Sequence, residues 1–68
     1  MPESAKKLVF LVEKGVSSEK MTEIQKEAAR ERAAGAAVLV AGMNKNKKFQ
    51  KEQLAGEGWT EFREFFAR

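Results

Sequence analysis

Few side chains in this sequence could carry chemistry, and the residues that most enzymes rely on are missing. The chain contains no His, Cys or Tyr, and no Asp occurs anywhere in it. The usual pairs of nucleophile and general base therefore cannot be assembled, and Ser4, Ser17 and Ser18 lie in a tail and at a predicted helix start. Lys or Glu can act as a base, but the glutamates lie mostly beside basic residues on a solvated helix face. We expect a protein that is not an enzyme.

The same inventory limits metal and cofactor binding. Without His, Cys or Asp, only glutamates remain as side-chain ligands. Glu13 ends a predicted strand, a position where nucleotide-handling α/β domains often place an acid, but the next strand is followed by no acidic cluster. The loop at 13–18 lacks the glycine spacing of a phosphate-binding loop, so an ordinary turn is the simpler interpretation. We expect no metal, no cofactor and no small-molecule substrate.

Lysines are concentrated in one short stretch that also contains Asn44, Asn46 and Phe49. The four are Lys45, Lys47, Lys48 and Lys51. They exceed the net charge of the whole chain, which is +3, because the rest of the chain is slightly acidic. A helix starting near Asn46 would add free N–H groups that suit a phosphate. The cluster fits contact with a nucleic-acid backbone, without any means of reading bases; a solvated face that aids solubility is the commoner alternative.

Aromatic residues are concentrated near the end of the sequence. The four are Trp59, Phe62, Phe65 and Phe66. At ~100° per residue they fall within about 120° of one helix face, which predicts a short amphipathic helix over 59–68. Core packing is the commoner reason for such a stripe, but Trp and Phe are also anchors of protein interfaces. Because four rings are difficult to bury under a small sheet, we expect some of them to contact another chain.

Four further elements must position these groups. The run Leu8-Val9-Phe10-Leu11-Val12 is typical of a strand buried on both faces. After a turn at 15–18, good helix formers continue to Ala34, with Ser18 as the expected N-cap and Gly35 as the stop. We predict a strand at 7–13, a helix at 18–34, a strand at 36–42 and a helix at about 47–55 that either Asn44 or Asn46 caps.

This order predicts a small α/β (α+β) fold. It consists of a β-α-β unit followed by one or two short C-terminal helices, in one domain spanning 1–68 with a loose lead-in at 1–6. A sheet of two strands is marginal on its own, and a chain of 68 residues has a core that only just outweighs its chain entropy. We therefore expect a homodimer, formed either through exposed strand edges that extend the sheet or through the closing helix.

The leading functional hypothesis is a small protein-protein interaction module, such as an inhibitor, adaptor or regulator, that binds the surface of a partner protein. Trp59, Phe62, Phe65 and Phe66 are its candidate contact residues. The alternative is a nucleic-acid-binding accessory protein that uses Lys45, Lys47, Lys48 and Lys51. The N-terminus does not resemble a signal peptide and the apolar run is too short to cross a membrane, so we expect a cytoplasmic protein.

Overall fold

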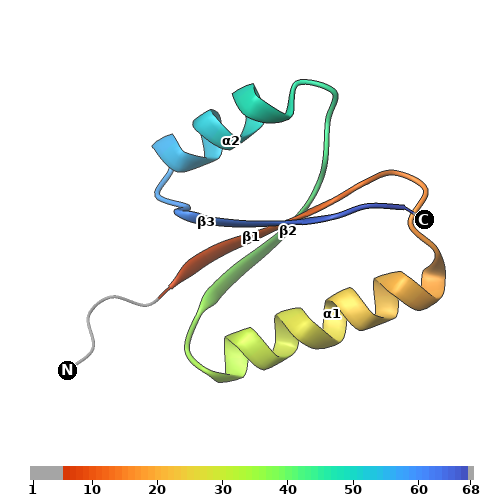
Figure 1. Cartoon of the computed structure of the whole chain (residues 1–68). Coiled ribbons are helices and arrows are strands. Elements are labelled where there is room, and N and C mark those ends of the chain that lie inside the picture. Colours follow the sequence, from red (N-terminus) through yellow and green to blue (C-terminus); the bar gives the residue numbers. More distant parts are fainter. Residues whose placement is uncertain (1–5, 68) are drawn as a thin grey trace.

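A three-stranded parallel sheet with a helix on each face forms the protein (Figure 1). The computed structural model describes residues 6–67, so the predicted lead-in at 1–6 lies outside the described residues except for Lys6. The elements in chain order are β1 (Lys7–Val12), α1 (Ser18–Ala33), β2 (Ala37–Gly42), α2 (Lys47–Gly56) and β3 (Glu61–Phe65). Strand order is β2-β1-β3, and β1 runs parallel to both neighbours. The fold is a small α+β arrangement.

The central strand β1 carries most of the core. Leu8, Val9, Phe10 and Leu11 have no exposed surface, as expected for a parallel strand covered on both faces. Leu8, Phe10 and Val12 point to the α1 side and pack with Ile24 and Ala28 of that helix. Side chains alternate along a strand, so Val9 and Leu11 point to the face that α2 covers (Figure 1).

The start and end of α1 follow from local signals. Ser17, one residue before the predicted cap, has extended backbone angles, and its Oγ accepts a hydrogen bond of 3.1 Å from the Lys20 N–H. Glu19 lies in the first turn, where the helix dipole favours an acid. Gly35 follows the last turn with φ 101°, a left-handed angle that glycine adopts without strain.

The predicted closing helix over 59–68 is wrong, because β3 occupies Glu61–Phe65. This strand pairs with β1, and the Glu13 N–H donates a hydrogen bond of 2.9 Å to the Phe65 carbonyl. The phenylalanine spacing suits a helix, but aromatic residues and Thr also favour strands. A second helix there would leave one side of β1 without hydrogen bonds in a buried position, which is costly.

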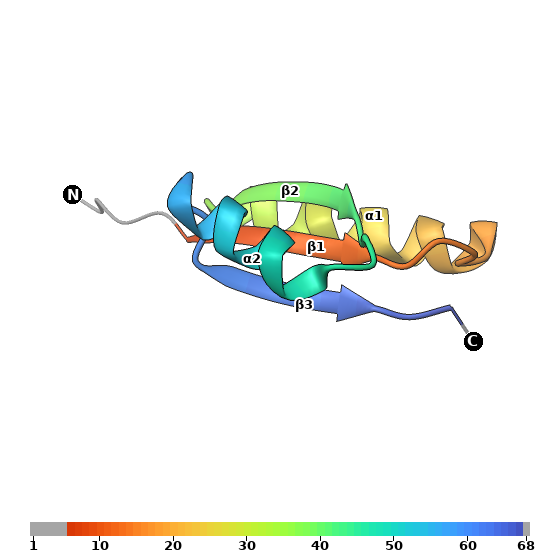
Figure 2. The ribbon, with the colours of Figure 1, turned by 90° about the horizontal axis from the view of Figure 1, so that it is seen from above.

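The third strand also corrects the prediction of a two-stranded sheet. It changes the expected reason for dimerisation, because a single chain already shields both faces of β1. Between residues 43 and 67, only α2 is helical, and it ends one residue beyond the predicted 47–55. Viewed from above, β1 lies between β2 and β3 (Figure 2). A strand from another chain would therefore have to pair with the outer edge of β2 or of β3.

No helix among residues 6–67 is both long enough and apolar enough to span a lipid bilayer.

Candidate interaction surface

The outer edge of β2 can be traced from its bonds to β1. The N–H groups of Ala37 and Met43 donate to the carbonyls of Lys6 and Val12, at 2.8 and 2.9 Å. Because backbone groups of successive strand residues point to opposite sides, the groups of residues 38, 40 and 42 point away from the sheet.

Side chains cap two of the three outward carbonyls of this β2 edge. The Arg32 guanidinium of α1 donates to the Val38 carbonyl at 3.0 Å. The Gln50 amide of α2 donates to the Gly42 carbonyl at 2.7 Å, and its oxygen accepts from the Asn44 N–H at 3.0 Å. Two of the outward carbonyls of β2 therefore already have partners, which hinders the addition of another strand.

The outer edge of β3 differs. The Phe65 carbonyl accepts its hydrogen bond from the Glu13 N–H on the β1 side. By the same alternation, the backbone groups of Phe62 and Glu64 point away from the sheet. Within residues 6–67, no side chain forms a hydrogen bond to these outward groups. The β3 edge therefore presents unpaired donors and acceptors, which is the arrangement that accepts a further strand.

Charged side chains on β3 bind the strand to both helices. On the α1 side, Arg63 contacts Glu27 at 2.6 Å and Glu31 at 3.1 Å. On the α2 side, Glu64 contacts Lys47 at 3.0 Å and Lys51 at 2.5 Å. Neighbouring β3 residues point to opposite faces, so these charges fix the position of the strand between the helices and leave its outer backbone edge open.

The ion pairs shift two pKa values. Hydrogen bonds from Lys51 and Lys47 hold the pKa of Glu64 below its ordinary value, although partial desolvation opposes them. For Arg63, partial burial lowers the pKa, but the hydrogen bonds and charges of Glu31 and Glu27 outweigh it and the pKa is raised. Both side chains are therefore charged over the whole neutral range.

The lysine cluster is divided by these contacts. Lys47 and Lys51 are engaged by Glu64, whereas Lys45 and Lys48 are exposed. All four surround the start of α2, where the Asn46 side chain accepts a hydrogen bond of 3.4 Å from the Phe49 N–H. The charge available to an external anion is thus smaller than the sequence suggests.

The four aromatic residues do not form one face. Phe65 points toward α1, and its ring lies 5.1 Å from that of Phe10 between centroids. Phe66 is 44% exposed on the opposite side, with the Lys47 Nζ 5.3 Å from its ring centroid. Phe62 is half-buried on the α2 side of the strand, and Trp59 is half-buried in the turn before it.

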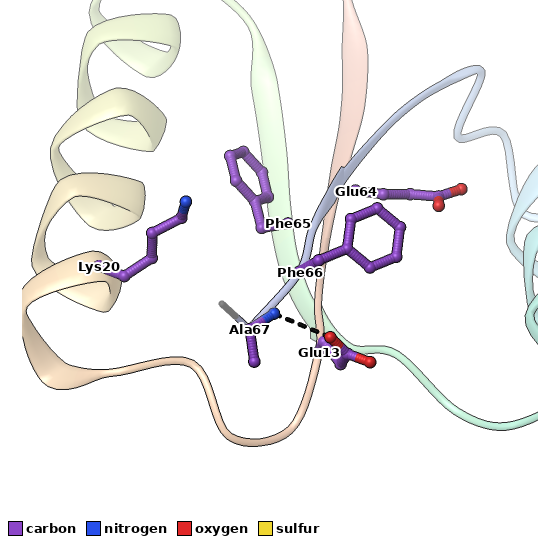
Figure 3. Close-up of a pocket in the computed structure, with 6 residues that line it drawn as sticks. All are labelled: Glu13, Lys20, Glu64, Phe65, Phe66 and Ala67. Atoms are coloured by element: carbon purple, nitrogen blue, oxygen red, sulfur yellow. Dashed lines mark hydrogen bonds between the residues drawn. The ribbon is translucent and has the colours of Figure 1, made fainter.

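A hollow of about 590 Å³ lies where β1 and β3 end (Figure 3). Its lining residues are Glu13, Lys20, Glu64, Phe65, Phe66 and Ala67. Glu13 accepts a hydrogen bond of 2.8 Å from the Ala67 N–H, so its carboxylate holds the chain after β3 against the end of β1. In the part of the chain that the structure describes, no three carboxylates lie close enough to hold one metal ion. The hollow is open to solvent.

Comparison of the sequence with protein-family models, with curated proteins and with solved structures finds no match.

Sequence reasoning missed the residues that decide which edge is open. In the sequence, Arg32 and Gln50 are ordinary polar residues of helices. No local pattern indicates that their side chains bond the outward carbonyls of β2. One signal for β3 was present: the alternation of strands and helices up to α2 favours a further parallel strand. The dense Trp, Thr and Phe residues after Gly58, which has φ 105°, are compatible with it.

Proposed function

We propose that this chain is a small non-enzymatic protein-interaction module that binds a strand of another polypeptide along the outer edge of β3. An inhibitor, adaptor or regulator can act in this way by occupying a partner's surface. The missing catalytic side chains favour this class over an enzyme. A cytoplasmic location is part of the same proposal.

One observation carries the proposal: within residues 6–67 no side chain caps the outward backbone groups of Phe62 and Glu64, while two of the three outward carbonyls of β2 are capped. In strand addition, main-chain hydrogen bonds supply affinity and alternate side chains supply specificity. Phe62 and the exposed Phe66 lie along this edge on the α2 side and supply apolar contact surface.

Two variants at one position separate backbone pairing from side-chain effects. Glu64→Pro removes an outward N–H that makes no bond within the sheet, and proline is tolerated at a strand edge in that orientation. Glu64→Gln keeps the N–H and removes the charge. Circular dichroism should show that both variants keep the fold.

Peptides selected from a displayed random library against the wild-type chain then test the edge. We expect them to bind Glu64→Gln normally and to bind Glu64→Pro roughly tenfold more weakly by calorimetry, since one or two hydrogen bonds are lost. A library that yields no binding peptide, or peptides that bind both variants equally, contradicts the proposal.

Nucleic-acid binding through Lys45, Lys47, Lys48 and Lys51 is the second proposal. It is supported by the exposure of Lys45 and Lys48 beside the N-terminus of α2. With about two uncompensated charges per chain, affinity for a DNA duplex should fall with log–log salt slope of about −2. A flat salt response between low and physiological salt, measured by fluorescence anisotropy, would remove this alternative. Lys45→Glu/Lys48→Glu is the matching charge-reversal variant.

A further inference from the structure

The strand that best complements the β3 edge is β3 itself. We propose, on the basis of the proposed function, that a second copy of this chain pairs its β3 antiparallel with the β3 of the first, with Phe62 opposite Phe62 of the copy. The two-fold axis is perpendicular to the sheet, so the two three-stranded sheets join into one. Both α1 helices then lie on one face and both α2 helices on the other.

Symmetry limits the possible registers to those centred on one residue, which then faces its own copy. Centring on Glu61, Arg63 or Glu64 places a charge directly opposite an identical charge, which destabilises a strand pair. Centring on Phe65 brings no opposite charges together, and that ring already packs on Phe10. Centring on Phe62 places Glu61 of each copy opposite Arg63 of the other.

The two charged side chains are accessible for this contact. The side chain of Glu61 is 51% exposed and that of Arg63 is 35% exposed. Both point to the α1 face of the sheet, where Arg63 already contacts Glu27 and Glu31 of α1 and Glu61 lies 4.0 Å from the Lys6 Nζ. Because α1 packs mainly against β2, Glu61 of the second copy reaches the Arg63 guanidinium from the open edge and joins these ion pairs. On the other face the two Phe62 rings meet across the strands.

The same symmetric pairing through β2 would require bonds to be broken first. Its outward carbonyls at Val38 and Gly42 already accept hydrogen bonds from Arg32 and Gln50. A second copy would have to displace both side chains to form a regular ladder. The β3 edge needs no such rearrangement.

Single cysteines test the register directly, because the natural sequence contains none. In the Phe62-centred pair the Cα atoms of the two Phe62 positions are about 5.5 Å apart, which a disulfide spans. The two Glu64 positions are offset by four residues, or about 14 Å along the strands at about 3.4 Å per residue. Under mild oxidation we expect Phe62→Cys to form a covalent dimer at least tenfold faster than Glu64→Cys or Val40→Cys.

Sedimentation equilibrium supplies a second readout on proteins without cysteine. Glu61→Lys places a lysine opposite Arg63 of the second copy and should raise the dissociation constant of the dimer roughly tenfold. Glu57→Lys makes the same change in net charge at an exposed position after α2 and should leave the dimer unchanged.

The outcomes separate this inference from the function on which it rests. Wild-type protein that stays monomeric at millimolar concentration, while selected peptides still require the β3 edge, overturns the second copy as occupant and leaves the proposed function standing. Faster cross-linking through Glu64→Cys or Val40→Cys overturns it as well. Monomeric protein together with peptides that ignore Glu64→Pro overturns both.

Discussion

The two outer strands contrast in composition and in the state of their edges. β2 is aliphatic, with Val38, Leu39 and Val40 at its centre, whereas three of the five β3 residues are charged. From composition alone, β2 would be expected to pair with another strand more readily than β3. Yet β2 has two of its outward carbonyls capped by side chains, and β3 has no such caps among the described residues. Whether an edge can accept a strand depends on the backbone bonds that remain available, as well as on hydrophobicity.

The charges of β3 do not blunt its edge, because they point to the helices. Arg63 is held by Glu27 and Glu31 of α1, and Glu64 by Lys47 and Lys51 of α2. A charge at a strand edge discourages pairing when a partner would desolvate it alone. Here Arg63 and Glu64 already have counter-ions that stabilise the position of the strand, and the third charge, Glu61, remains 51% exposed and lies 4.0 Å from Lys6.

The largest expected effect is the difference in stability between a proline on the inner side of β3 and a proline on its outer side. Arg63→Pro removes an N–H that faces β1, leaves a buried carbonyl without its donor and loses two ion pairs. The carbonyl alone costs about 1–3 kcal/mol, enough to unfold much of a chain of this size. Glu64→Pro removes an N–H on the outer side and should keep a cooperative urea transition. Equal loss of structure in both variants, seen by circular dichroism, would contradict the assigned strand orientation.

The next effect tests the caps of β2. Arg32→Ala/Gln50→Ala exposes the Val38 and Gly42 carbonyls, and each lost hydrogen bond should cost about 1 kcal/mol. Because the chain would then have two open edges, we expect species larger than a dimer in sedimentation velocity as concentration rises. Arg30→Ala/Gln53→Ala removes similar exposed side chains from the same two helices and is the control. An unchanged size distribution in the first variant would show that the caps do not close the edge.

The smallest effect concerns the charges that hold β3. The lowered pKa of Glu64 means that the folded chain binds this proton less readily than the unfolded chain, so the stabilisation is complete above the unfolded pKa of about 4.3. It is lost as the pH falls through the lower folded pKa. Wild type should exceed Glu64→Gln by about 0.5–1 kcal/mol at pH 7 in urea unfolding. The stabilities of the two proteins should converge as the pH falls below the folded pKa of Glu64; a difference that stays constant from pH 7 into the acid range would contradict the assignment.

Much of the fold could be predicted because the signals are local. The run Leu8–Val12 is apolar without interruption, Gly35 stops α1, and Asn46, one of the two predicted candidates, caps α2. The bounds of α1 and β2 match the prediction at one end and differ by one residue at the other. A helix was predicted where β3 lies because Phe62, Phe65 and Phe66 have helical spacing. The pairing of Phe62 and Phe65 with β1 involves residues about fifty positions away.

The candidate surface was predicted only in part, and for a related reason. Phe62 belongs to the proposed contact surface, but as a residue of an edge strand and not of a helix face. The lysine cluster is visible in the sequence, whereas its partial neutralisation by Glu64 depends on the position of β3. The caps supplied by Arg32 and Gln50 acquire meaning only once β2 is known to lie at an edge.

Amide hydrogen exchange of the wild-type chain, followed by NMR from dilute to concentrated solution, tests the difference between the edges most directly. We predict that the Phe62 N–H exchanges quickly when dilute and gains protection of roughly tenfold or more as the second copy binds, while the Val40 N–H keeps a constant exchange rate. Protection that rises at Val40 and not at Phe62 would contradict the account.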